Sequence, residues 1–137
     1  MAMDEIPYRY SFCKASWGMS IELIATKVNK STFNDKYIAI NEMLWISKKL
    51  DWLSDRERYY LDVGCKIQEG GELTFRDKGE LIFITNVEFN PADYQEEGLA
   101  MVVAGWIEMN MGLRSKSIEV SFDKESNKYV FESSFFK

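Results

Sequence analysis

Histidine is absent from all 137 residues of the chain. Histidine is the commonest protein metal ligand and the usual general base near neutral pH. Its absence removes histidine zinc sites, catalytic triads that contain histidine and histidine-dependent nucleases. Any catalysis would have to use carboxylates, lysine or tyrosine. Because the glycines also lack the spacing of a phosphate-binding loop, we expect a binding protein rather than an enzyme.

Cysteine and long apolar runs are scarce as well. The two cysteines, Cys13 and Cys65, form neither a metal-binding nor a redox motif, and we expect both to be buried, reduced thiols. No stretch is long and apolar enough to span a membrane. The N-terminal stretch "MAMDEIPYRY" lacks the basic start and apolar run of a signal peptide. The expectation is a cytoplasmic protein without membrane contact.

Prolines are few, and neither Pro7 nor Pro91 marks a linker. Apolar residues make up 46% of the chain and aromatic residues 15%, which is enough to form a core. Together with the length, this composition predicts a single domain spanning residues 1–137.

Acidic residues outnumber basic ones by 22 to 17, and the excess lies in the middle third. Residues 55–97 contain 11 acids and 5 bases, whereas the segments on either side are close to neutral. A nucleic-acid-binding protein normally shows a basic stripe, so we expect no nucleic-acid partner. An acidic surface attracts cations or a basic protein instead.

Alternation of apolar and polar residues predicts most of the strands. The stretches 8–16 and 19–28 form an N-terminal hairpin around the turn at Trp17 and Gly18. Residues 69–71 form a turn, and 72–75 and 80–89 a second hairpin. "ELIFITNVEF" (80–89) is apolar on both faces, which is typical of a central strand covered on both sides. A closing hairpin joins residues 116–123 to 128–136.

Two segments between these hairpins are harder to assign. "NDKYIAINEMLWISKKL" (34–50) has one broad apolar face, which predicts an amphipathic helix, although Tyr37–Ile40 could be a short strand. "RYYLDVGCKIQ" (58–68) alternates and predicts a strand. Ser54 and Glu57 match a helix-capping box, but Gly64 and the alternation favour the strand.

A helix is predicted after "NPADYQEEG" (90–98), with Asn90 as its cap and Pro91 at its first position. Its apolar residues recur at helical spacing and Gly112 ends it. The order becomes two strands, a helix, about three strands, a helix and two strands. That order predicts an α+β fold, with a mainly antiparallel sheet of about six to seven strands and two helices packed on it. The apolar helix residues are Leu99, Val102, Val103, Trp106 and Ile107.

Carboxylates crowd into "NPADYQEEG", where Asp93, Glu96 and Glu97 follow Glu88. The simplest explanation is that they stabilise the start of the predicted helix through its dipole, at about 0.3–1 kcal/mol each. A magnesium or calcium site would also use carboxylates, but the calcium-loop spacing is missing, so we expect neither metal nor cofactor. Carboxylate catalysis would need two carboxyl groups that face each other across a cleft.

A recognition surface is the remaining explanation for these carboxylates. Aromatic residues beside acids, such as Trp52 next to Asp51 and Asp55, suit the capture of a basic protein, because the rings are buried on binding and the acids steer the approach. We expect the first turns of the helix to expose the acids. The candidate partner-binding residues are Glu88, Asp93, Tyr94, Glu96 and Glu97.

In size and charge, and through "NPADYQEEG" and the acidic middle third, the chain resembles the immunity proteins of bacterial polymorphic-toxin and contact-dependent inhibition systems. The resemblance implies an inhibitor that neutralises a basic toxin, often a nuclease, by covering its active site. Two alternatives stay open. One is an adaptor or homodimer that pairs through a C-terminal edge strand containing Phe135 and Phe136. The other is an enzyme that uses carboxylate or tyrosine chemistry.

The position of Trp106 on the apolar helix face generates a prediction. Replacing Trp106 with alanine should lower the free energy of unfolding by about 3–5 kcal/mol, because a large buried ring is lost from the core. Urea denaturation measures the change. A loss below about 1 kcal/mol would mean that Trp106 is not packed in the core.

Overall fold

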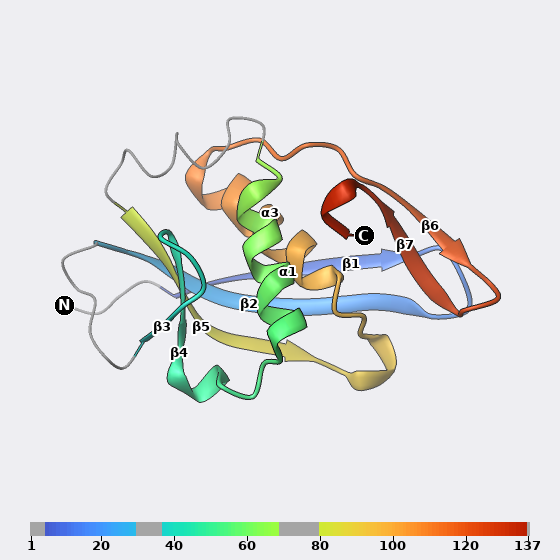
Figure 1. Ribbon diagram of the computed structural model, residues 1–137, viewed down its shortest axis with the longest axis horizontal. Helices are drawn as coiled ribbons and strands as arrows, with labels where there is room; N and C mark the ends of the chain where they lie inside the picture. The colour runs from blue at the N-terminus through green and yellow to red at the C-terminus, as the bar shows by residue number, and fades with distance from the viewer. Residues whose placement is uncertain (1–4, 30–36, 69–79, 137) are drawn as a thin grey trace.

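The computed structural model describes residues 5–29, 37–68 and 80–136, and it has an α+β fold (Figure 1). None of the helices in these residues is long and apolar enough to cross a membrane. The main sheet has five strands in the order β1-β2-β5-β4-β3, and a separate sheet pairs β6 with β7. The strands are β1 (Ile6–Cys13), β2 (Gly18–Asn29), β3 (Tyr37–Ala39), β4 (Leu44–Ser47), β5 (Glu80–Phe89), β6 (Glu119–Asp123) and β7 (Lys128–Glu132).

Two helices, α1 (Asp55–Lys66) and α3 (Gly98–Met111), lie on the same face of the main sheet (Figure 1). β1 and β2 form the predicted N-terminal hairpin. β5 pairs antiparallel with β2 but parallel with β4. A parallel pair needs a crossover connection, and the chain between β4 and β5 contains α1. The strand–helix–strand connection therefore fixes α1 above the sheet.

β5 is the central strand that its sequence predicts. Ile82 and Ile84 are buried in the main core, whereas Leu81 and Phe83 are buried in a second cluster with Val28. Successive strand residues point to opposite faces, so the two clusters lie on opposite sides of the sheet. The apolar run of β5 is explained by burial on both faces.

The predicted helix over residues 34–50 is wrong, and its short-strand alternative at Tyr37–Ile40 is close to the observed β3. Within the described residues, this segment forms β3 and β4. Asn41 makes the turn between them, since its side-chain oxygen accepts hydrogen bonds from the backbone nitrogens of Met43 (2.7 Å) and Leu44 (2.8 Å). Asparagine side chains stabilise turns in this way. This local turn and pairing with β5 outweigh the apparent amphipathic pattern.

The predicted strand over residues 58–68 is also wrong, because most of it belongs to α1. The capping box decides the outcome. The Ser54 hydroxyl accepts a hydrogen bond from the Glu57 backbone nitrogen at 3.1 Å, and the Glu57 carboxylate accepts one from the Ser54 backbone nitrogen at 2.9 Å. Both bonds satisfy donors that a helix start otherwise leaves without partners. The residues that alternate also lie on the broad buried side of the helix.

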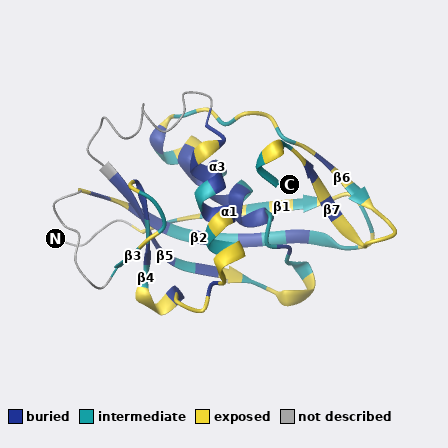
Figure 2. Cartoon of the chain, viewed as in Figure 1, coloured by how far each residue is buried: buried dark blue, intermediate teal, exposed yellow. Residues whose placement is uncertain are grey.

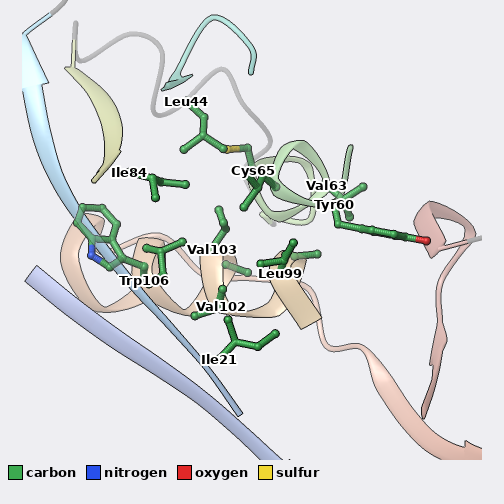
Figure 3. Close-up of a cluster of buried hydrophobic side chains, with 14 of the residues drawn as sticks. Ile21, Leu44, Tyr60, Val63, Cys65, Ile84, Leu99, Val102, Val103 and Trp106 are labelled. Atoms are coloured by element: carbon green, nitrogen blue, oxygen red, sulfur yellow. The ribbon is translucent and has the colours of Figure 1, made fainter. Parts of the chain in front are cut away.

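The core lies between the two helices and the sheet, where large side chains from all three interlock (Figure 3). Trp106 is 1% exposed, as predicted, and its indole nitrogen donates a hydrogen bond to the Ile6 carbonyl at 2.8 Å. Gly64 allows α1 and α3 to approach closely. A Cβ atom at Gly64 would lie 2.5 Å from the Val103 Cβ and 2.8 Å from the Ala100 carbonyl oxygen.

The closing hairpin is confirmed as β6 and β7, but it forms its own sheet at one end of the molecule (Figure 1). Phe135 and Phe136 belong to a 3₁₀ turn, not to a final strand. Cys65 is buried as expected, whereas Cys13 is exposed, because it lies at the end of β1 on the face away from the helices. The turn predicted at residues 69–71 and the strand predicted at 72–75 lie outside the described residues.

The close approach at Gly64 generates a second prediction. Replacing Gly64 with alanine should lower the free energy of unfolding by about 1–3 kcal/mol, because the added methyl group forces the helices apart. In an open helix position the same change would stabilise by up to about 1 kcal/mol. Urea denaturation should show the loss, with Met109→Ala on the 73% exposed position of α3 as a control of small effect. A more stable Gly64→Ala variant would contradict this packing.

Candidate functional site

The acidic stretch 90–98 does not form one helix. Asn90 caps a 3₁₀ turn, Pro91–Asp93, by accepting a hydrogen bond from the Ala92 backbone nitrogen at 3.0 Å. α3 begins only at Gly98, and its first turn contains no acid. The explanation of Asp93 by the dipole of this helix is therefore wrong. The stretch instead connects three parts of the fold through Tyr94, Gln95 and Glu96, as their contacts show.

Tyr94 joins the end of β5 to the start of α1. Its ring stacks on Phe89 with ring centroids 3.7 Å apart, and its hydroxyl donates a hydrogen bond to Glu57. The other oxygen of the Glu57 carboxylate completes the capping box. Burial, and then the hydrogen bond to Glu57, raise the pKa of Tyr94 far above its usual value. Tyr94 is consequently a neutral structural anchor whose hydroxyl is already engaged.

Gln95 connects the stretch to the closing hairpin. Its side chain is buried, its oxygen accepts a hydrogen bond from the Tyr129 backbone nitrogen at 2.8 Å, and its nitrogen donates one to the Tyr129 carbonyl at 2.6 Å. One side-chain amide thus pairs with both backbone groups of a strand residue, as a neighbouring strand would. No sequence motif indicates that Gln95 is buried and bonded to Tyr129, so its role appears only in the structure.

Tyr129 holds the hairpin from its other side. Its hydroxyl donates a hydrogen bond to the Trp17 carbonyl at 2.6 Å and accepts one from the Lys14 backbone nitrogen at 3.0 Å. The Lys14 ammonium group also donates to the Val120 carbonyl at 3.1 Å. The hairpin is therefore fastened both to the β1–β2 turn and, through Gln95, to the acidic stretch.

Glu96 and Glu97 lie against the first turns of α1. The Arg56 Nε atom is 2.6 Å from a Glu96 carboxylate oxygen, and the Arg56 guanidinium carbon is 5.9 Å from the Tyr60 ring centroid. The hydrogen bond to Glu96, and then the charges of Glu96, Tyr60 and Glu97, raise the pKa of Arg56. Burial and the charge of Glu97 raise the pKa of Tyr60. The ion pair places Glu96 beside Arg56, and Glu97 is the next residue in the chain.

We call this region the α1 entry surface. It combines charged and aromatic side chains from the start of α1, the segment before α3 and the C-terminal turn, and the exposed start of α1 is visible in Figure 2. Its members are Asp55, Arg56, Tyr59, Tyr60, Glu96, Glu97 and Phe136.

The five predicted partner-binding residues do not share one face. Tyr94 and Glu96 lie beside α1, where they contact Glu57 and Arg56, and Glu97 follows Glu96 in the chain. Glu88 lies opposite Glu22 in the register of β5 and β2, on the sheet face that points away from the helices. Asp93 lines a hollow of about 460 Å³ at the ends of β1 and β2. The binding role of these residues stays a prediction.

The expected exposure of Asp93, Glu96 and Glu97 is wrong, because all three are partly buried. Glu88 is the exposed carboxylate of the predicted set. Trp52, beside Asp51 and Asp55, is 50% exposed and its ring centroid lies 6.2 Å from that of Phe89. Trp52 and its neighbouring acids are adjacent in the sequence, and the structure places the Trp52 ring next to the Phe89–Tyr94 stack.

The α1 entry surface encloses a hollow of about 290 Å³. Its walls are polar at Asp55 and Arg56 and aromatic at Tyr59, Tyr60 and Phe136. The Tyr59 hydroxyl donates a hydrogen bond to the Phe135 carbonyl at 2.8 Å, which fixes the Tyr59 ring beside the C-terminal turn.

Within the described part of the chain, no three cysteine or acidic side chains are grouped so that they could hold a metal ion. The chain matches no protein-family model, no curated protein and no solved structure.

The role of Gln95 generates a third prediction. Replacing Gln95 with alanine should lower the free energy of unfolding by about 2–4 kcal/mol, because two backbone groups of Tyr129 lose their hydrogen-bond partner. Gln95→Glu keeps the shape but loses the donor to the Tyr129 carbonyl, so it should also destabilise. Urea denaturation measures both variants, with Glu88→Gln as an exposed control. If Gln95→Ala unfolded like the control, the hairpin would not depend on this contact.

Proposed function

We propose that the protein is a non-enzymatic inhibitor of the immunity-protein type, which captures a basic toxin or nuclease through the α1 entry surface. The observation that carries the proposal is the charge of this surface. Asp55 lines the same hollow as Arg56, Glu96 forms an ion pair with Arg56, and Glu97 follows Glu96 in the chain, so three carboxylates accompany one guanidinium group beside aromatic rings. Such a surface suits a positively charged protein partner.

Charge beyond the surface supports the same partner. Residues 79–113 contain six acids and neither lysine nor arginine, so no basic side chain within this segment offsets their negative charge. Asp51 is also exposed, in the turn that precedes α1. Carboxylates of this kind accelerate the encounter with a basic protein, even where each adds little to the final affinity.

Aromatic side chains supply the area for a tight contact. Trp52 is 50% exposed and Tyr59 is 45% exposed, and both belong to residue types that dominate binding energy at protein interfaces. Both rings are supported, Trp52 by Phe89 and Tyr59 by the Phe135 carbonyl. Because a supported ring loses little conformational freedom on binding, its burial contributes more to affinity.

Pairing through a C-terminal edge strand has less support. Gln95 bonds to both backbone groups of Tyr129 and so occupies part of the β7 edge that β6 leaves open. Phe136 stacks on Phe131 and Tyr60, with centroid distances of 5.0 and 5.9 Å. The outer backbone groups of Tyr129 and the Phe136 ring are thus already engaged within the chain. Two separate thiols fit the reducing cytoplasm, where we place the inhibitor.

The proposal is tested by reversing charge on two different faces. Asp55→Lys with Glu97→Lys changes the α1 entry surface, whereas Glu88→Lys with Glu119→Lys makes the same net change away from it, at exposed positions of β5 and β6. Glu96 is left intact because it pairs with Arg56. A basic partner is first captured from the source cell with the wild-type protein and identified by mass spectrometry.

Surface plasmon resonance then gives the association rate of each variant with this partner. We expect the first pair to slow association at least tenfold at low salt and the second pair to slow it much less. The difference should shrink as salt rises, because the Debye length falls from about 30 Å at 0.01 M to about 10 Å at 0.1 M. The proposal fails if the captured partner is not basic, if both pairs have equal effects, or if salt does not matter.

A further inference from the structure

We infer that the hollow in the α1 entry surface receives an arginine side chain of the basic partner. The inference rests on the proposed function and names the contact that would anchor it. The hollow measures about 290 Å³ and is lined by Asp55, Arg56 and the rings of Tyr59, Tyr60 and Phe136. A planar cation that can stack on a ring and bond to a carboxylate matches these walls.

The chain's own Arg56 already shows that this surface holds a guanidinium group. Arg56 combines a ring contact, with its guanidinium carbon 5.9 Å from the Tyr60 ring centroid, and a carboxylate contact, with Nε 2.6 Å from Glu96. Cations bind to aromatic faces through the ring quadrupole. Arginine also bonds to carboxylates through a rigid, planar set of donors. A second arginine would use the same two kinds of contact.

The surface has capacity for a second cation. Among the described residues, none bonds to the Asp55 side chain, and the Tyr59 ring is 45% exposed. Arg56 forms an ion pair with Glu96 and donates a hydrogen bond to the Tyr60 hydroxyl at 3.4 Å. Within the described residues, the carboxylates of Asp55 and Glu97 form no ion pair with Arg56. A guanidinium group in the hollow would offset their negative charge.

The walls of the hollow are held in place before any partner binds. The Tyr59 hydroxyl bonds to the Phe135 carbonyl, and Phe136 stacks between Tyr60 and Phe131. An anion is the wrong occupant, although helix starts often bind anions. The first turn of α1 already contains the carboxylates of Asp55 and Glu57, which satisfy the helix dipole and repel a further negative charge.

The test is a titration of the full ¹⁵N-labelled chain with acetyl-triarginine amide at low salt, followed by NMR. We expect shifts confined to the backbone amides of Asp55–Tyr60, Phe135 and Phe136. Acetyl-trilysine amide should bind at least threefold more weakly, because an ammonium group lacks the planar stacking face. Acetyl-triglutamate amide should cause no shift at these amides.

Three variants separate the contributions. Asp55→Asn should weaken triarginine binding at least fivefold by removing the carboxylate, and Tyr59→Ala should do the same by removing the ring. Tyr59→Phe keeps the ring but loses the hydrogen bond to the Phe135 carbonyl, so it should weaken binding less than Tyr59→Ala does. The control Glu88→Gln should stay within twofold of wild type. Unchanged resonances in the main sheet confirm that each variant is folded.

The inference is overturned if the triarginine shifts lie elsewhere, if triglutamate binds equally well, or if Asp55→Asn and Tyr59→Ala bind as wild type does. None of these results affects the capture of a basic protein by the acidic surface as a whole. Conversely, the captured partner could prove acidic while the hollow still binds triarginine. That result would overturn the proposed function but not the arginine-binding property of the hollow. The two failures are therefore distinguishable.

Discussion

The side-chain amide of Gln95 is the contact on which the arrangement of the molecule most depends. It lies in a short segment whose neighbours bond in other directions, Tyr94 to the cap of α1 and Glu96 to Arg56. The segment thus joins the central strand, the first helix and the closing hairpin. Burying the Gln95 amide costs little free energy, because its hydrogen bonds to Tyr129 replace those to water. Removing the amide would leave two backbone polar groups without partners.

This structural role limits what the acidic segment can do in binding. Tyr94 and Glu96 have internal partners, and Asp93 faces another part of the surface. What remains available to a partner is the excess charge and the exposed aromatic area around the start of α1. The acidic segment therefore packs behind the α1 entry surface. Of the five predicted partner-binding residues, only Glu96 and Glu97 add charge to this surface.

The sequence predicts features that depend on local order and fails where distant contacts decide. Alternation identifies β1 and β2, an apolar run on both faces identifies β5, and helical spacing identifies α3. In α1, alternation is misleading, since a helix buried on a broad side between a sheet and a second helix can show apolar residues at every second position. In the sequence, Gly64 favours a strand, but in the structure it permits close contact between α1 and α3. Asn41 and Gln95 act through bonds to particular backbone atoms, which no periodicity reveals.

Native-state hydrogen exchange of the wild-type chain, followed by NMR, tests most directly whether the segment at Tyr94–Glu96 joins these parts into one unit. The informative amides are those of Tyr129, which bonds to Gln95, and Glu57, which bonds to Ser54, with Ile84 in the central strand as reference. If the parts form one unit, all three amides should exchange with opening free energies within about 1 kcal/mol of one another. A Tyr129 amide that opens several kcal/mol more easily than Ile84 would contradict the account.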